Sequence, residues 1–266
     1  MAKITEYAKV TSFDSGDILL KDGTNGTKTI GVADAAAEFL RLMNTAPINH
    51  RNFYRGKYLG NAVTDAQITA IRNGTFEDLW IGDYWTINGV NYVIADINYW
   101  YNCGDTALTK PHLIIVTEKQ MYTAKMNEEN TNAGGYVGSL MYTTNLEEAK
   151  TKINAAFPNL VLTHKNYLSN TDKGAAGAWF DSTVELMTEE MVYGHRQFGE
   201  DVKMTVDKTQ LALFALNPQM INIRQTYWLR NAFGSTTFAH VNYGGHASHY
   251  DSASSTLGVR PVFAIG

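Results

Sequence analysis

Histidine and aspartate side chains gather near the C-terminus, where imidazole and carboxylate groups are potential metal ligands. His246, His249 and Asp251 fall within six residues, and His240 precedes them. Zinc and related metals use such ligands, but this spacing matches no zinc motif on a predicted helix. The single cysteine, Cys103, also excludes a cysteine-rich site. We therefore expect no metal site and no cofactor.

Paired carboxylates would support a different chemistry, the hydrolysis of glycans. The acidic residues that would have to converge in space are Asp83, Asp96, Asp105 and Glu185. No Gly-x-Ser-x-Gly motif or phosphate-binding glycine loop is present, and Cys103 lacks a cysteine–histidine signature, so we expect it to be a small buried residue. The sequence favours a protein that is not an enzyme, with glycan hydrolysis as an alternative.

Composition and charge limit the class of partner. The 266 residues are 44% hydrophobic, which is enough for one large domain or for a small module and a medium one. The net charge is −4 and no two Lys or Arg residues are adjacent, so we expect no nucleic-acid partner. Apolar runs fall well short of the about 20 residues of a membrane span, and we expect neither membrane insertion nor a secretory signal.

The elements that must position these residues begin with a small N-terminal module, residues 1–50. Strands at 17–20 and 27–32 flank a turn cluster at 22–26, and a helix follows from an N-cap at Asp34 through Met43. A hairpin and one short helix do not enclose a core that stabilises itself. We therefore expect an anchor that docks on another surface or forms a trimer.

Residues 51–266 read as one domain of the α+β class. The predicted elements, in order, are a helix opened by the capping box Thr64–Gln67 and closed at 73–74, a hairpin of 84–87 and 90–94 around Asn88-Gly89, a buried strand at 113–116, a helix at 145–157 capped by Asn145, and a strand at 160–163. Segments 188–193 and 210–216 fit either a helix or a strand, and apolar strands follow at 227–230 and 258–265.

The segment between those last two strands, residues 231–256, has a composition of its own, and we call it the insert. It contains ten residue types and lacks Lys, Glu, Gln, Met and Trp, which make up 46 of the 266 residues. A random window of this length lacks all five roughly once in a hundred. The same five types cannot arise when an asparagine codon varies at its first two adenines. The mix of Tyr, Ser, Gly and Asn favours recognition, as in antibody loops, although an ordinary surface loop is the alternative.

The sequences that flank the insert resemble a known class of proteins. The entry Trp228-Leu229-Arg230 and the exit 258–263 resemble the C-terminal region of bacteriophage variable proteins that retroelements diversify. The run from Asp17 to Ile30 resembles the start of phage tail-fibre or head-fibre proteins. The resemblance covers about the first 35 and the last 40 residues. It implies a C-type-lectin-like fold and a virion-surface, often trimeric, ligand-binding protein.

Residue types suggest how this region is divided between framework and contact roles. We expect Trp228 and Phe263 in the core, with Arg230 and Arg260 holding the insert through carboxylates or backbone carbonyls. Aromatic and planar polar groups dominate binding hot spots, so we expect ten insert residues to contact a ligand. They are Asn231, Phe233, Phe238, His240, Asn242, Tyr243, His246, His249, Tyr250 and Asp251.

The expected function is therefore adhesion without catalysis. Made in the cytoplasm of a bacterial host, the protein would sit on the virion surface and bind a host cell-surface protein or glycan. Its N-terminal module would attach a homotrimer to the tail or head, and avidity would strengthen weak single-site contacts. The alternatives are a capsid-decoration or head-fibre protein and a virion-associated glycan-degrading enzyme.

Overall fold

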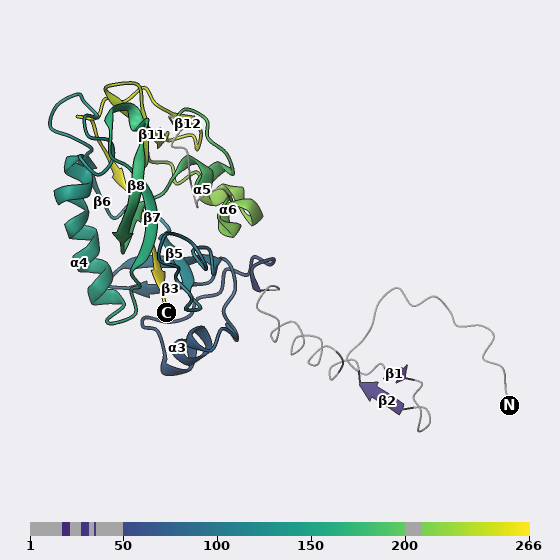
Figure 1. Ribbon diagram of the computed structural model, residues 1–266. Coiled ribbons are helices and arrows are strands. Elements are labelled where there is room, and N and C mark those ends of the chain that lie inside the picture. Colours follow the sequence, from purple (N-terminus) through teal and green to yellow (C-terminus); the bar gives the residue numbers. More distant parts are fainter. Residues whose placement is uncertain (1–17, 22–27, 32–34, 36–49, 200–208) are drawn as a thin grey trace. The chain divides into compact units, whose positions relative to one another are not determined.

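The computed structural model describes residues 18–21, 28–31, 35, 50–199 and 209–266 (Figure 1). The chain divides into two compact units, Met1–Ala46 and Pro47–Gly266. In the first unit, β1 (Ile18–Lys21) pairs antiparallel with β2 (Lys28–Gly31), which confirms the predicted hairpin. The predicted helix from Asp34 through Met43 lies outside the described residues apart from Ala35.

Two five-stranded sheets form the body of the second unit, and this confirms the α+β class. We call them the central sheet and the insert sheet. The central sheet has the order β3 (Tyr84–Ile87), β4 (Val90–Ile97), β5 (Leu113–Thr117), β14 (Pro261–Ile265), β9 (Val184–Leu186). The insert sheet has the order β12 (Ala247–Ser248), β11 (Thr237–Val241), β10 (Tyr227–Phe233), β13 (Thr256–Val259), β6 (Tyr122–Lys125).

The remaining elements surround these sheets. They are α3 (Asp65–Arg72), α4 (Leu146–Ala156), α5 (Glu189–Tyr193), α6 (Ala212–Leu216) and the hairpin of β7 (His164–Ser169) with β8 (Gly177–Ser182). Figure 1 shows α4 along one side of the unit, α3 near the C-terminus, and β11 and β12 at the other end. No helix in the described part of the chain is long and apolar enough to span a membrane.

Local sequence explains the central sheet. The predicted hairpin is confirmed, and its turn places Asn88 and Gly89 at φ 51° and 79°, as a type I′ turn requires. Every residue of β5 and β14 is buried, which accounts for their continuous apolar sequences. Phe263 in β14 and Trp228 in β10 are fully buried, so their predicted place in the core is confirmed.

Arg260 is the single residue between β13 and β14, where the chain passes from one sheet to the other. Its buried guanidinium donates from Nε to the carbonyl of Thr117 at 2.9 Å and from Nη1 to that of Met220 at 2.9 Å. The predicted carbonyl contacts are therefore present, but their acceptors lie outside the insert. Arg260 holds the junction of the two sheets, and the expectation that it binds the insert directly is wrong.

The helices confirm some local signals and correct others. Thr64 and Gln67 form the predicted capping box of α3. Asn145 holds the N-cap position of α4, but its side chain makes no capping bond. A π-helical turn over Met141–Asn145 leads directly into the helix, and the Nδ2 of Asn145 donates to the carbonyl of Lys125 at 2.8 Å. Both segments left open by the sequence, 188–193 and 210–216, contain helices, α5 and α6.

The strand predicted at 160–163 is wrong. Only Val161 forms a bridge there, to Ile265, and the strand begins at His164, where the chain pairs with β8 instead. The imidazole of His164 is buried and stacks on the indole of Trp100 with ring centroids 3.7 Å apart. This burial lowers the pKa of His164 from 6.5 to about 3.

We expect the buried His164 to make folding stability depend on pH. The unfolded chain takes up the proton below pH 6.5 while the folded chain resists it, so stability is complete above that pH and declines as pH falls toward 3. The decline due to this group is about 1.4 kcal/mol per pH unit. His164→Phe keeps a flat ring on Trp100 but does not titrate. Urea unfolding between about pH 6 and pH 4 should therefore show that the free energy of unfolding falls less steeply with decreasing pH in this variant than in the wild type. Equal slopes for the two proteins would contradict this assignment.

Candidate ligand-binding surface

The two ends of the insert are held in neighbouring strands of one sheet. Tyr227 in β10 is the parallel partner of Gly258 in β13, so the chain leaves the framework and returns to it at adjacent points. The indole Nε1 of Trp228 donates to the carbonyl of Ala124 in β6 at 3.0 Å. The strands that carry the two ends of the insert are therefore paired with each other, and Trp228 connects β10 to β6.

Two residues expected to contact a ligand belong to the interior instead. Phe238 and His240 are 0% and 1% exposed because β11 lies inside the insert sheet, with neighbours on both edges and four consecutive buried side chains. The Nε2 of His240 lies 3.0 Å from a carboxylate oxygen of Asp251. Burial lowers the pKa of His240, while Asp251 opposes that shift. The expectation that Phe238 and His240 contact a ligand at the surface is thus wrong. Asp251 connects its own segment of the insert to β11 through His240.

Two asparagines of the insert are engaged in shaping it. The Oδ1 of Asn231 accepts the backbone N–H of Glu189 at 2.8 Å, which connects β10 to the start of α5. The Oδ1 of Asn242 accepts the N–H groups of Gly244 and His246 at 2.9 and 3.1 Å. Both side chains are half-buried, and their bonds position the backbone.

The remaining predicted contact residues form the accessible part of the insert. Tyr243 and Tyr250 are 75% and 86% exposed, and His246 is exposed beside Tyr243. The rings of Phe233 and His249 lie 4.2 Å apart, and those of His249 and Tyr250 lie 4.6 Å apart. The structure therefore brings these side chains to the surface in two groups, one at the 242–246 turn and one around His249.

A residue outside the insert completes the second group. The ring of Phe198 lies 4.5 Å from that of His249 and 6.2 Å from that of Phe233. We call Phe198, Phe233, His249 and Tyr250 the aromatic cluster. The sequence around Phe198 does not indicate this role, because a phenylalanine in a polar segment gives no information about its long-range partners.

Phe198 is positioned by a buried carboxylate that the sequence also did not reveal. Glu189 accepts the backbone N–H groups of Gln197, Phe198 and Gly199, the last at 2.7 Å. Burial raises the pKa of Glu189, and these three N–H groups oppose the shift. Thr188 and the acidic residues after it resemble an ordinary helix N-terminus, so the sequence gives no indication that Glu189 also organises residues 197–199.

Asn132 supports the insert from another direction. Its Nδ2 lies within hydrogen-bond distance of the carbonyls of Phe233, Gly234 and Thr237, at 3.3, 3.0 and 3.1 Å. This buried side chain fixes the tight turn between β10 and β11. Framework residues from distant parts of the chain thus determine the shape of a segment that has few apolar residues of its own.

Arg230 also acts on the framework. Its backbone N–H donates to the carbonyl of Met187 at 2.9 Å, and its buried positive charge opposes the rise that burial causes in the pKa of Glu185. The hydroxyl of Tyr136 donates to the same carboxylate at 2.8 Å. The expected carboxylate neighbour of Arg230 therefore lies in β9, outside the insert.

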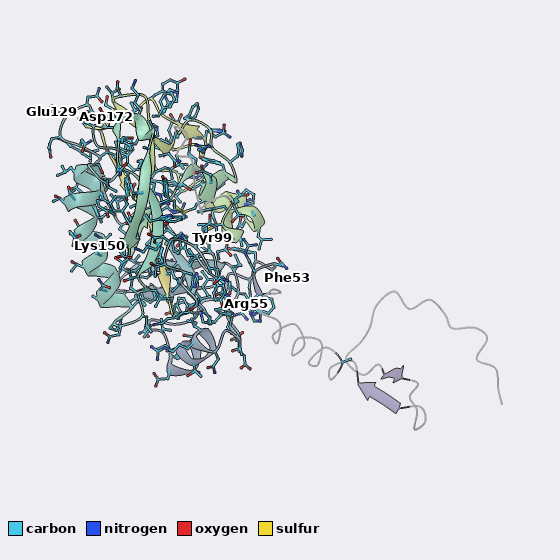
Figure 2. All side chains as sticks on the ribbon, viewed as in Figure 1. Phe53, Arg55, Tyr99, Glu129, Lys150 and Asp172 are labelled. Carbon is cyan, nitrogen blue, oxygen red and sulfur yellow. The ribbon has the colours of Figure 1, made fainter. Side chains whose placement is uncertain are left out.

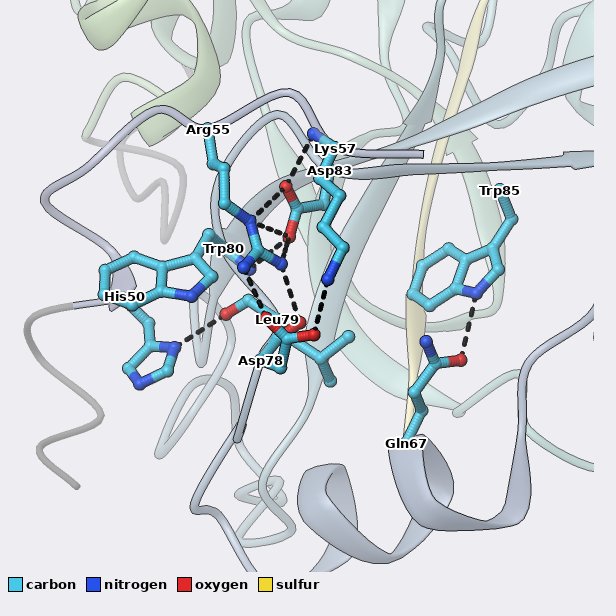
Figure 3. Close-up of polar contacts among 9 residues, drawn as sticks. All are labelled: His50, Arg55, Lys57, Gln67, Asp78, Leu79, Trp80, Asp83 and Trp85. Atoms are coloured by element: carbon cyan, nitrogen blue, oxygen red, sulfur yellow. Dashed lines mark hydrogen bonds and ion pairs between the residues drawn. The ribbon is translucent and has the colours of Figure 1, made fainter. Parts of the chain in front are cut away.

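The other carboxylates considered for hydrolysis also have separate partners. Asp83 is fully buried and binds Arg55 together with the N–H groups of Lys57 and Trp80 (Figure 3). In the same network, Arg55 and Lys57 contact Asp78. This arrangement neutralises a buried charge and fixes the chain where the second unit begins.

Asp96 is bound by Arg51, and Asp105 lies 3.6 Å from the Nζ of Lys165. Cys103 is half-buried, against the expectation that it is buried. Within the described ranges, no three His, Cys, Asp or Glu side chains are grouped closely enough to hold a metal ion. Asp83 and Asp96 are each paired with an arginine, and Asp105 lies near a lysine.

The fold and this surface define an α+β protein that presents aromatic and polar side chains on a rigid framework. Comparisons with protein-family models, with curated proteins and with solved structures find no match to this chain.

Proposed function

We propose that this chain is a bacteriophage virion-surface protein that binds a host cell-surface ligand through the exposed part of the insert. The observation that carries the proposal is the exposure of Tyr243 and Tyr250 on a segment whose ends are fixed in β10 and β13. Tyrosine offers a large contact area at low entropic cost, and a rigid framework reduces the entropy lost on binding.

The assignment to a C-type-lectin-like fold is part of the same proposal. Its support is that the two resembling segments, Trp228–Arg230 and 258–263, form neighbouring strands and a buried junction at the base of the insert. A segment diversified at adenines would then vary chiefly in its turns. The buried positions of β11 would tolerate only small or apolar replacements.

The same proposal assigns attachment to the virion to the predicted N-terminal module, residues 1–50. Figure 2 shows Phe53 and Arg55 toward one end of the second unit and Asp172 at the other, and β11 and β12 lie at the Asp172 end (Figure 1). Three copies on one base would raise the effective concentration of the binding surfaces and convert weak contacts into stable adhesion.

Alanine substitution of the two exposed tyrosines tests the proposal. We expect phage that carries Tyr243→Ala with Tyr250→Ala to adsorb to its host at least about tenfold less, because two exposed aromatic contacts are lost. Phe198→Ala should weaken adsorption by a smaller factor, since it removes a support of His249. Adsorption is measured as loss of free phage after mixing with cells.

Tyr101→Ala is the matched control, because Tyr101 is 43% exposed and lies outside the insert. Normal adsorption of the double variant would overturn the proposal. If that result came with stoichiometric binding of the chain to capsids, a capsid-decoration or head-fibre role would replace it.

A further inference from the structure

Three neighbouring hollows on the second unit share lining residues, and none of them is lined by a residue of the insert. The first has a volume of about 150 Å³ and is lined by Tyr54 and Tyr84. The second, about 370 Å³, includes Asn91, and the third, about 320 Å³, includes Asn222. Glu118 lines all three, so we call this feature the Glu118 groove.

Tyrosine rings form one end of the groove, and the backbone beneath holds them in place. The ring of Tyr54 packs on Gly82, where a Cβ atom would lie only 2.2 Å from the ring and where φ is +86°. Tyr54 is 42% exposed, and the neighbouring rings of Tyr58 and Tyr84 lie 5.6 Å apart. Flat, partly exposed rings of this kind fit the C–H faces of pyranose sugars.

Planar polar groups occupy the centre of the groove and are already oriented. The Nδ2 of Asn91 donates to Glu118 at 2.6 Å, and its Oδ1 accepts the hydroxyl of Thr86 at 2.7 Å. Gln120 also lines the second hollow, but its buried Oε1 lies against Gly258 and does not belong to the polar groups at the surface of the groove. Carboxylate and amide groups accept and donate in pairs, which suits a ligand with adjacent hydroxyls.

Charge and strand pairing further restrict the class of ligand that fits the groove. The groove carries one acidic residue, Glu118, and two basic ones, Lys119 and Arg224, so its formal charge is only +1 and an uncharged ligand is favoured. A peptide would ordinarily add to a free strand edge. The edge strand β3 is already covered, since the N–H of Leu59 donates to Tyr84 at 2.8 Å and that of Tyr84 donates to Lys57 at 3.0 Å.

The third hollow reaches the insert. The Nδ2 of Asn222 donates to the carbonyl of Gly244 at 3.2 Å, in the turn that carries the exposed Tyr243. The groove is built from residues outside the insert, and it ends beside a surface whose composition suggests variation. A ligand in the groove would therefore meet constant side chains, whatever the insert contains.

We propose that the Glu118 groove binds an uncharged oligosaccharide of pyranose units. Tyr54 and Tyr84 contact sugar faces, while Asn91 and Glu118 bind hydroxyl groups in the adjoining hollow. The three hollows that share Glu118 give the groove room for more than one sugar unit. This binding does not depend on the insert, so it goes beyond the adhesive function proposed above.

Calorimetric titration of the full chain tests the groove with three linear neutral probes, cellohexaose, chitohexaose and maltohexaose. We expect at least one to bind, and we expect Tyr54→Ala and Glu118→Ala each to raise its Kd about tenfold or more. Tyr101→Ala is again the matched control, because its ring is 43% exposed against 42% for Tyr54, and it should change the Kd less than about twofold.

Thermal unfolding shows whether each variant is folded. If Tyr54→Ala does not fold, the Kd of Glu118→Ala alone decides the test. Failure of all three hexasaccharides to bind would overturn the proposal, as would binding that both groove variants retain. Preference for an uncharged hexapeptide would overturn it too. Tyr243→Ala with Tyr250→Ala should lower phage adsorption without changing the Kd, so failure at the groove and failure at the insert are distinguishable.

Discussion

Replacing Arg51 with methionine should lower the free energy of unfolding at neutral pH by about 3 kcal/mol. Its Nε and Nη2 donate to the two carboxylate oxygens of Asp96 at 2.6 and 3.0 Å. Asp96 is fully buried, and it also accepts the N–H groups of Ile97 and Ala212. Methionine keeps much of the apolar contact but leaves a buried negative charge without its cation. The loss lies at the lower end for such pairs because the Arg51 side chain is 38% exposed.

The same variant should show a pH dependence of definite sign. Burial raises the pKa of Asp96 above 3.8, and Arg51 opposes that rise. Without Arg51 the pKa rises further, so the folded state binds a proton more readily than the unfolded state. The stability of the variant then falls as pH increases through that pKa, and its deficit against the wild type is smaller at about pH 4.5 than at pH 7.

Urea unfolding of both proteins at the two pH values measures this difference. Lys165→Met is the matched control, because its partners Asp105 and Asp181 are 52% and 70% exposed. Exposed pairs of this kind contribute less than about 1 kcal/mol. Equal losses for the two variants would contradict a special role for the buried pair.

Trp228→Ala should have the other large effect, a loss of about 4 kcal/mol in the free energy of unfolding. The indole is fully buried, and its Nε1 bonds to Ala124 in β6 although β13 lies between β6 and β10 in the sheet. Its removal leaves a cavity and breaks the contact that spans three strands. It also withdraws the ring that packs edge-on against His240 at 5.7 Å.

Chemical unfolding measures the loss, and two further variants interpret it. Trp228→Phe keeps most of the volume but not the hydrogen bond, so we expect a loss of about 1 to 2 kcal/mol. Trp179→Ala removes a half-buried indole of the β7–β8 hairpin and should cost less than Trp228→Ala. If Trp179→Ala were the more destabilising change, the framework role of Trp228 would be wrong.

Elements with complete local signals were predictable from the sequence. In three segments the local residues alone specify the structure, and each forms as expected. They are the capping box at Thr64, the Asn88-Gly89 turn and the apolar run at 113–116. Asn145 gives α4 no side-chain capping bond because its side chain bonds to the distant Lys125. Tertiary contacts of that kind are invisible to a local pattern.

The candidate surface likewise has parts that local sequence predicts and parts that depend on tertiary contacts. The apolar residues of the strands on both sides of the insert made those strands predictable. Composition, however, does not indicate which side chains of a strand face the core. Phe238 and His240 were therefore expected at the surface although β11 is buried. Phe198 and Glu189 were missed because their roles depend on bonds and ring contacts with residues that no local pattern connects.

The pairing of Tyr227 with Gly258 has a consequence for protein engineering. When the ends of a segment are already neighbours, lengthening it adds little loop-closure entropy, about 0.6 kcal/mol for each doubling. The turn at 242–246, which exposes Tyr243 and lies between β11 and β12, is then a grafting position for foreign peptides. The chain would serve as a display scaffold whose cargo changes while β10, β11 and β13 remain constant.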